Sequence, residues 1–237
     1  MPSATSKITV IPLHETFCAE VQGVDFSQPI TADVKEAIQA AIDKYGVLVF
    51  RKTGLLQTDD ADDKHAAFAA LFGELDDMSV HLKVGRKLRL KNVQMFDVSN
   101  LDSDGNLVTE NDPARLNMMK GNNLWHADLA FNSRRSGYSI LRGAKLPPKG
   151  TGGDTEVHFP FSISFSPAYL LQFMDARTAY EDLPEETKAK INNLVGNNSM
   201  WHNRKLAAPE YYADVNPRDY PFSKHKLVTN HTNTGRK

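Results

Sequence analysis

The chain has 237 residues, of which 41% are hydrophobic, so it is long enough to bury an ordinary core in one large domain or two small ones. Its 28 lysines and arginines nearly balance its 29 aspartates and glutamates, and the net charge of -1 comes with no basic stripe to match a phosphate backbone. We therefore expect a soluble globular protein without a nucleic-acid partner.

The N-terminal segment and the single cysteine bear on where the protein works. One cysteine, Cys18, excludes an internal disulfide framework and favours a reducing intracellular setting. The opening residues, MPSATSKITV, lack the charged start and apolar run of a signal peptide. No uncharged apolar run reaches the roughly 18 residues of a membrane span. These features predict a cytoplasmic protein without a membrane partner.

The first part of the chain alternates strand patterns with helix patterns. Apolar residues at spacings of three and four predict a helix that Thr31 or Asp33 can cap and that Gly46 ends. The segment before this helix is β-branched and alternating, and the segment after it, GVLVFR, is short and apolar, so both predict strands. The elements expected here lie at residues 8–12, 31–46, 46–51 and 62–75.

Strand patterns dominate further along. Residues 80–117 alternate short apolar pieces with polar clusters such as DVSNLDSDGN, which predicts strands joined by exposed loops. Residues 136–145 predict another strand. Pro184 and the acidic residues after it predict a helix over residues 183–195. Helices near the front, followed by strands between loops, favour a β-rich α+β domain with flanking helices.

The segment GNNLWHADLAF, residues 121–131, places a histidine two positions before an aspartate. On an extended strand such residues share a face, so His126 and Asp128 would project together. An imidazole and a carboxylate are two of the three ligands in the facial triad of non-haem Fe(II) oxygenases. On spacing alone, two polar residues at a strand edge are the simpler interpretation, because H-x-D is common by chance.

The flanking motifs favour the metal. GNNLWHADLAF, followed by SGYSILRGAKLPPKGTGGDT, resembles the α-ketoglutarate-dependent dioxygenase family typified by the taurine and 2,4-dichlorophenoxyacetate dioxygenases (TauD/TfdA-like). That family has a W-H-x-D motif and, after a later strand, a G-G-D/N-T motif; here Thr155 comes 29 positions after His126. The opening also matches, through FCAEVQGVDFSQPIT, YGVLVFR and AFAALFGEL. The resemblance covers most of residues 8–237.

The resemblance implies a double-stranded β-helix (jelly roll) with helices packed outside it, in one domain over residues 1–237. It implies Fe(II), O2 and the cosubstrate α-ketoglutarate, with His126 and Asp128 as iron ligands and no other catalytic side chain. Thr155 would hydrogen-bond an α-ketoglutarate carboxylate, and Asn122 would lie near the substrate. The implied reaction oxidises a small organic acid, phenoxyacetate-like or sulfonate-like, while α-ketoglutarate becomes succinate and CO2. The chain is compatible with a homo-oligomer.

Other polar residues have simpler interpretations. His225 and His231 could each be proposed as the second iron histidine, but the resemblance places the family's distal histidine further along the chain. His202 either faces the substrate or is a surface histidine. Cys18 has no basic neighbour in the sequence to lower its pKa, so we expect no nucleophilic role. The cations interpreted as solvated surface residues are Lys120, Arg134, Arg135 and Lys149.

The chain departs from the family at its C-terminus, because it stops at Lys237, before the strands that carry the distal histidine and an arginine that pairs with α-ketoglutarate. Without that third ligand and that guanidinium, we expect these 237 residues to bind Fe(II) weakly and not to turn over α-ketoglutarate. The alternative to an enzyme is therefore a C-terminally truncated, non-catalytic remnant or misassigned fragment with an incomplete sheet.

The chain also departs from the family at residues 157–172, VHFPFSISFSPAYLLQ. Deleting them gives GGDTEFMDARTAY, which fits the family without a gap. The sixteen residues include no Asp, Glu, Lys or Arg, although 24% of the chain is charged. A valine codon begins with GT and a glutamine codon can end in AG, so we interpret the segment as an intron translated in frame. The alternative is a genuine insertion, whose four aromatic residues would form a lid or a dimer contact.

Overall fold

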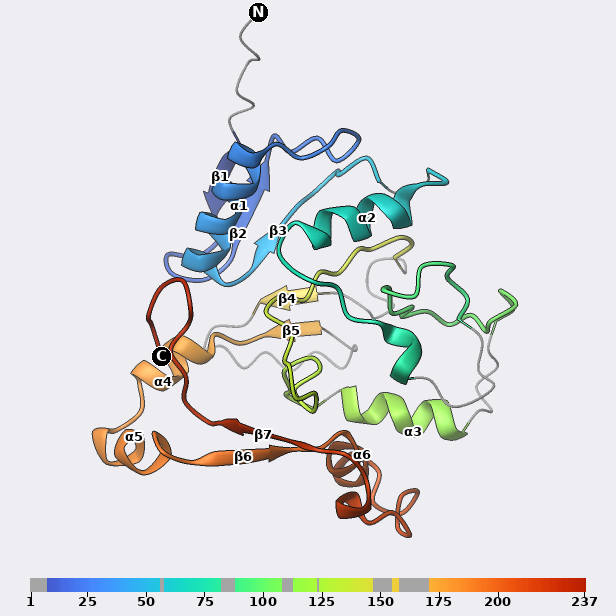
Figure 1. Ribbon diagram of the computed structural model, residues 1–237, viewed down its shortest axis with the longest axis vertical. Coiled ribbons are helices and arrows are strands. Elements are labelled where there is room, and N and C mark those ends of the chain that lie inside the picture. The colour runs from blue at the N-terminus through green and yellow to red at the C-terminus, as the bar shows by residue number, and fades with distance from the viewer. Residues whose placement is uncertain are drawn as a thin grey trace, which may run out of the picture. The chain divides into compact units, whose positions relative to one another are not determined.

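The computed structural model describes residues 8–55, 58–81, 88–107, 113–122, 124–146, 155–157 and 171–237 (Figure 1). The chain divides into two compact units. The first comprises Met1–Gly73, Leu141–Lys188 and Thr229–Lys237, and the second comprises Glu74–Ile140 and Ala189–Val228. The single domain expected over residues 1–237 stays a prediction, because two compact units can belong to one domain.

A three-stranded sheet opens the first unit, with strands β1 (Thr9–Pro12), β2 (Ala19–Gln22) and β3 (Leu48–Val49) in that order. β1 and β2 are antiparallel, with Val10 opposite Val21, whereas β3 runs parallel to β2. The predicted strands at residues 8–12 and 46–51 are confirmed, the second as two residues only. β2, which the patterns did not predict, alternates buried with more exposed residues, as expected of a strand with one covered face.

Helix α1 (Ala32–Tyr45) follows the sequence prediction closely (Figure 1). Thr31 is the residue before its first turn, and the Thr31 hydroxyl donates to the Asp33 carboxylate. The buried residues Val34, Ile38, Ala41 and Tyr45 repeat at spacings of three and four. Gly46 ends the helix at a φ of 72°, which glycine adopts without steric cost, and its N–H donates to the Ile42 carbonyl at 2.8 Å.

Helix α2 (Ala61–Ala70) contributes Ala61 and Phe68 to the core of the first unit. The ring of Phe68 packs edge-on against Phe26 and Phe72, with ring centroids 5.0 and 5.3 Å apart, respectively. The helix ends five residues before the predicted end at residue 75, because the N–H groups of Leu71 and Phe72 bond to carbonyls three residues back and Gly73 follows. The apolar residues Leu71 and Phe72 keep the helical spacing beyond Ala70, and for this reason the sequence predicted the C-terminal end of the helix too late.

Two short strands and two helices follow along the chain, and the second helix includes the boundary between the two units after Lys188. β4 (Thr155–Val157) runs parallel to β5 (Leu171–Phe173), and α4 (Ala176–Glu181) follows directly. α5 (Glu185–Ile191) confirms the helix predicted after Pro184, although it stops before residue 195, where the next strand begins. Most of the proposed insertion, including its four aromatic residues, lies outside the described residues.

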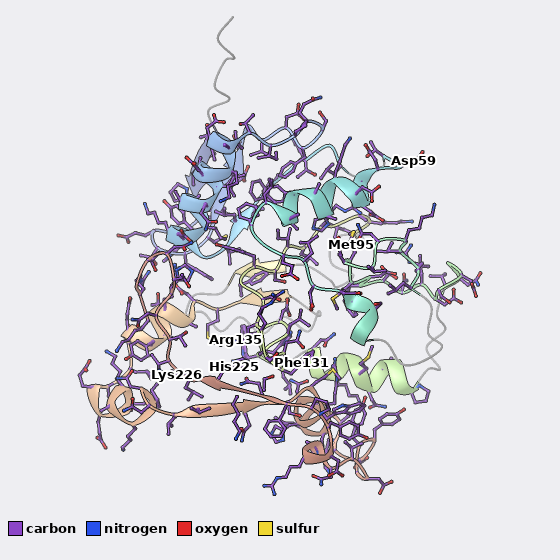
Figure 2. All side chains as sticks on the ribbon, viewed as in Figure 1. Asp59, Met95, Phe131, Arg135, His225 and Lys226 are labelled. Carbon is purple, nitrogen blue, oxygen red and sulfur yellow. The ribbon has the colours of Figure 1, made fainter. Side chains whose placement is uncertain are left out.

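The second unit contains the 3-10 helices η1 (Met78–His81) and η2 (Pro217–Asp219), the α-helices α3 (Pro113–Asn122) and α6 (Met200–Ala207), and one antiparallel pair of strands, β6 (Val195–Asn198) and β7 (Ser223–Lys226). α3 packs against α6. His225 of β7 is labelled in Figure 2. Its Nε2 lies 2.8 Å from the Asn132 carbonyl, so this histidine ties β7 to the loop that holds Asn132.

Two strand predictions in the second unit are wrong for the residues described. Within residues 88–107 the only β-pairing is one bridge between Leu101 and Leu107, and residues 113–122 are helical. The polar cluster makes turns instead, because Asp102 Oδ1 accepts from the backbone N–H groups of Asp104 and Asn106, each at 2.9 Å. Residues 136–145 also form no ladder with any described strand.

Helices and strands thus occur together, as the α+β prediction requires, and the strands belong to three small sheets in the described residues. The β-rich part of the prediction is not seen there, because the described strands have two to four residues each and the α-helices six to 14. The double-stranded β-helix, or jelly roll, that the family resemblance implies stays a prediction at this level. No helix among the residues described here is both long and apolar enough to cross a membrane.

Candidate metal centre

The backbone that holds the histidine and aspartate is a turn, not the strand predicted from alternation. Residues 125–127 belong to no strand, and a turn begins at Asp128. Leu129 has a φ of 53°, a left-handed conformation that a non-glycine residue adopts only at a cost. The predicted proximity is nevertheless found, because His126 Nε2 lies 3.3 Å from Asp128 Oδ1.

Each of the two side chains is oriented by a second hydrogen bond. His126 Nδ1 lies 2.7 Å from the Leu124 carbonyl oxygen, and since a carbonyl only accepts, Nδ1 carries a proton. The other nitrogen, Nε2, is then directed at Asp128. The second carboxylate oxygen of Asp128, Oδ2, accepts from the Ser139 hydroxyl at 2.6 Å. Both side chains are solvent-accessible, with 38% of His126 and 57% of Asp128 exposed.

The contact shifts the titration of both groups. The hydrogen bond with Asp128 raises the pKa of His126, while burial of the imidazole and the positive charge of Arg204 act to lower it. The hydrogen bond with His126 lowers the pKa of Asp128. Burial acts to raise this pKa, and the hydrogen bond from the Ser139 hydroxyl lowers it further. Because metal ligands must be deprotonated, a metal ion on Nε2 would displace any proton that this nitrogen carries.

The donor set fits a divalent transition metal. Bonds from histidine nitrogen or carboxylate oxygen to such an ion are about 2.0–2.2 Å long, taking zinc as the guide, so donors 3.3 Å apart can reach one ion together. Imidazole and carboxylate are also the ligand types of the Fe(II) facial triad. Within the described residues no group of three His, Cys, Asp or Glu side chains is placed to hold an ion. The described pair would thus supply two ligands of such an ion.

Asn122, predicted to lie near the substrate, is the last residue of α3 and is exposed. Its Oδ1 accepts from Arg204 Nη1 at 3.1 Å, and Arg204 also donates to the Met118 carbonyl. α6 approaches so closely that a Cβ on Gly121 would lie 2.5 Å from Arg204 Nη1. Sequence reasoning missed Arg204, whose charge acts on His126, because no local pattern signals a contact across 82 residues.

Thr155, predicted to contact α-ketoglutarate, belongs to β4 in the first unit, where its backbone pairs with Leu171. The Thr155 side chain lies outside the part of the chain that the structure describes, and the role of its hydroxyl stays a prediction.

The remaining candidates agree with their simpler interpretations. His202 is exposed on α6, and His231 Nδ1 lies 3.2 Å from the Thr234 hydroxyl. Arg134 pairs with Glu74 at 2.9 Å, and both side chains are 74% exposed, so this arginine is a solvated surface residue. Lys149 lies outside the described residues. Cys18 is buried, and this burial raises the pKa of its thiol, which disfavours a nucleophilic role.

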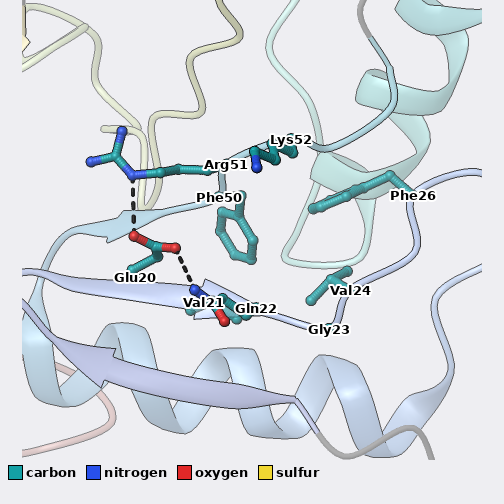
Figure 3. Close-up of a pocket in the computed structure, with 9 residues that line it drawn as sticks. All are labelled: Glu20, Val21, Gln22, Gly23, Val24, Phe26, Phe50, Arg51 and Lys52. Atoms are coloured by element: carbon teal, nitrogen blue, oxygen red, sulfur yellow. Dashed lines mark hydrogen bonds and ion pairs between the residues drawn. The ribbon is translucent and has the colours of Figure 1, made fainter.

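A cavity of about 420 Å³ lies in the first unit, lined by residues of β2, the loop after β2, and residues 50–52 (Figure 3). Glu20 and Arg51 form an ion pair 3.1 Å long on its wall. Lys52 also lines the cavity, and the histidine and aspartate of the candidate centre belong to the other unit.

Comparison with known proteins identifies the protein family to which this chain belongs. The family described as Taurine catabolism dioxygenase TauD, TfdA family matches residues 9–237. The chain belongs to that family, which confirms the resemblance seen in the sequence motifs.

Two characterised relatives act on phenoxy acids, as their names state. The alpha-ketoglutarate-dependent 2,4-dichlorophenoxyacetate dioxygenase of Cupriavidus pinatubonensis is 30% identical over 226 residues, which cover 95% of this chain and 70% of the relative. The (S)-phenoxypropionate/alpha-ketoglutarate-dioxygenase of Sphingobium herbicidovorans is 29% identical over 239 residues, which cover 96% of this chain and 68% of the relative. The chain therefore spans about two thirds of the length of these enzymes.

Solved structures agree. AAD-2, crystallised in complex with Mn(II) and N-oxalylglycine, superposes with a TM-score of 0.68 at 27% identity, over 96% of this chain and 70% of that one. A taurine dioxygenase from Burkholderia xenovorans superposes with a TM-score of 0.58 at 22% identity, over 97% of this chain and 61% of that one, and this match concerns the fold alone.

Proposed function

We propose that this chain is an Fe(II)- and α-ketoglutarate-dependent dioxygenase that oxidises a small organic acid of the phenoxyacetate type. The observation that carries the proposal is the 3.3 Å approach of His126 Nε2 to Asp128 Oδ1, within the W-H-x-D motif of a chain from this family. The Mn(II) in the AAD-2 structure supports a divalent metal in this fold. The names of the two phenoxy-acid relatives favour a phenoxyacetate over a sulfonate.

The side chains have separate tasks in this proposal. His126, through Nε2, and Asp128, through Oδ1, hold Fe(II), while the Leu124 carbonyl keeps the imidazole turned toward the ion. Thr155 donates to a carboxylate of α-ketoglutarate, and Asn122 lies beside the substrate. Bound iron, with α-ketoglutarate and O2, supplies the oxidation of a C–H bond, and α-ketoglutarate leaves as succinate and CO2. The cytoplasmic setting, the lack of a nucleic-acid or membrane partner, and a homo-oligomeric state stay predictions.

A turnover assay tests the activity. The purified chain is loaded with Fe(II) without oxygen, then exposed to oxygen with α-ketoglutarate and 2,4-dichlorophenoxyacetate, and succinate is measured. An active dioxygenase forms succinate that depends on the phenoxy acid. Activity is lost in His126→Ala and in Asp128→Ala and kept in His14→Ala, which removes a histidine of the first unit.

The same assay separates the enzyme from the non-catalytic alternative. A chain that binds a divalent metal through His126 and Asp128 yet forms no succinate contradicts the proposed activity. That result would match the expectation stated from the sequence for these 237 residues.

We also propose that residues 157–172 are an insertion relative to the family, translated from an intron. The proposal rests on the sequence, in which Glu156 joined to Phe173 gives GGDTEFMDARTAY. Each residue pair of the β4–β5 ladder includes a residue of this segment, so the ladder would be absent from a chain without it. Sequencing the transcript tests the intron origin, and a dominant message that retains all sixteen codons would contradict it.

A further inference from the structure

Ser139 makes a contact that no sequence motif indicated. It lies in residues 136–146, which belong to no helix or strand, eleven residues after Asp128. Its hydroxyl donates to Asp128 Oδ2 at 2.6 Å, whereas Oδ1 of the same carboxylate faces His126. The two oxygens of Asp128 are therefore distinguished by their partners.

The carboxylate needs such a partner to keep one orientation. The terminal torsion of an aspartate is broad, and 57% of the Asp128 side chain is exposed, so packing alone leaves it free to rotate. A hydroxyl bonded to an ionised carboxylate makes a short, charge-assisted hydrogen bond, and 2.6 Å is within that range. This bond holds Oδ2 away from the imidazole and leaves Oδ1 beside Nε2.

The histidine has a comparable support, the Leu124 carbonyl on Nδ1. Groups that hold the ligands of a metal in this way fix ligand orientation and contribute to metal affinity. The support of His126 is backbone and survives any substitution at Leu124, whereas the support of Asp128 is a side chain that a single substitution removes.

We infer that Ser139 is a positioning residue of the metal centre, which turns Asp128 so that it offers one oxygen to the ion. This inference rests on the proposed function and deepens it, because it concerns the same two ligands. Ser139 itself touches neither metal nor substrate in this scheme.

The test is the affinity for Mn(II) alone, measured from the electron paramagnetic resonance signal of the free ion. The Ser139→Ala substitution is expected to weaken binding by about 10-fold to 100-fold. The Ser139→Thr and Ser139→Val substitutions are matched in size and differ in the hydroxyl, so the threonine variant should bind close to wild type and the valine variant should be as weak as alanine. The Ser136→Ala substitution, at an exposed serine of the same segment, is the control and should bind like wild type.

The outcomes distinguish two failures. If wild type binds Mn(II), His126→Ala does not, and Ser139→Val binds like wild type, the role of Ser139 is overturned and the proposed function stands. Equal weakening in the threonine and valine variants would also overturn it, because the hydroxyl would then not matter. If wild type binds no Mn(II), the metal site is overturned and the inference with it. Circular dichroism of each variant verifies the fold, and the threonine–valine pair decides the question should the alanine variant unfold.

Discussion

The two units differ in what stabilises them. Among the described residues, every buried apolar side chain except Ala208 belongs to the first unit, where α1, α2 and the three-stranded sheet share a core. In the second unit many large apolar side chains are exposed, among them Phe96, Val98, Leu107, Trp125, Leu206 and Leu227. The candidate metal pair belongs to this second unit and lies at a turn.

This difference shows how the chain separates stability from chemistry. In the first unit, burial of apolar surface fixes the backbone, and this is the dominant favourable term in folding. In the second, hydrogen bonds such as those of Ser139, Arg204 and Asp102 fix local geometry with little burial. Functional residues commonly lie on such irregular segments, whose local stability is low.

The largest effect that separates the units is expected from two phenylalanines. Phe68→Ala removes a ring that is 8% exposed and contacts three other rings, so the free energy of unfolding should fall by about 3–5 kcal/mol. Phe96→Ala, at a ring that is 58% exposed, should change stability by less than about 0.5 kcal/mol. Urea unfolding measures both. Equal losses would mean that the second unit has a core of its own.

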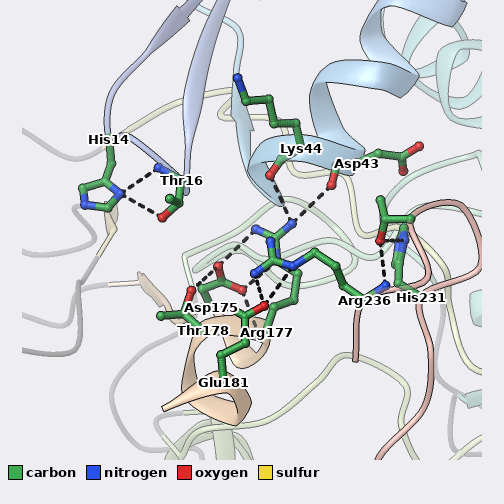
Figure 4. Close-up of polar contacts among 11 residues, drawn as sticks. His14, Thr16, Asp43, Lys44, Asp175, Arg177, Thr178, Glu181, His231 and Arg236 are labelled. Atoms are coloured by element: carbon green, nitrogen blue, oxygen red, sulfur yellow. Dashed lines mark hydrogen bonds and ion pairs between the residues drawn. The ribbon is translucent and has the colours of Figure 1, made fainter.

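Two arginine–carboxylate pairs give the next comparison. Arg177 Nε donates to Asp175 Oδ1 at 2.8 Å, and its Nη1 donates to the carbonyls of Asp43 and Lys44 in the last turn of α1 (Figure 4). Both side chains of the pair are largely buried, so Arg177→Ala should destabilise by about 3–5 kcal/mol. The matched change at the exposed pair of the second unit, Arg134→Ala, should cost less than about 1 kcal/mol. Similar unfolding midpoints for the two variants would contradict this account.

A smaller effect is expected at two glycines of the first unit. Gly46 and Gly54 have φ values of 72° and 73°, so alanine at either should cost about 1–2 kcal/mol from the left-handed backbone alone. At Gly46 the new Cβ would also lie 2.9 Å from Arg177 Nη2 and 3.2 Å from the Phe17 ring, whereas nothing lies within 4 Å at Gly54. Gly46→Ala should therefore be the less stable variant in thermal unfolding, and the reverse order would show that this packing is loose.

The smallest effect concerns acid. Burial alone would raise the pKa of Asp175, but hydrogen bonds and the charge of Arg177 outweigh it, so its folded-state pKa lies below the ordinary value of about 3.9. The resulting stability is present above that ordinary value and is lost as pH falls through the lowered folded-state pKa. Urea unfolding at pH 7 and pH 3 should show a smaller loss for Asp175→Asn than for wild type. An equal loss of stability in both proteins would show that Asp175 does not contribute to destabilisation by acid.

The sequence predicted the first unit better than the second for physical reasons. α1 was predicted correctly because its apolar spacing, its first-turn aspartate and Gly46 all act locally. The turn at His126 and Asp128 was not, because the positive φ of Leu129 has no signature in a leucine. Their proximity was still right, since both a strand and this turn bring residues i and i+2 together. The roles of Ser139 and Arg204 depend on contacts between distant residues, which no pattern along the chain can indicate.

Isothermal titration of the purified chain with Mn(II) tests most directly whether His126 and Asp128 form a metal site. If these two residues hold the ion, one Mn(II) binds per wild-type chain, and binding is lost in both His126→Ala and Asp128→Ala and kept in His14→Ala. Wild-type affinity in the first two variants would contradict it.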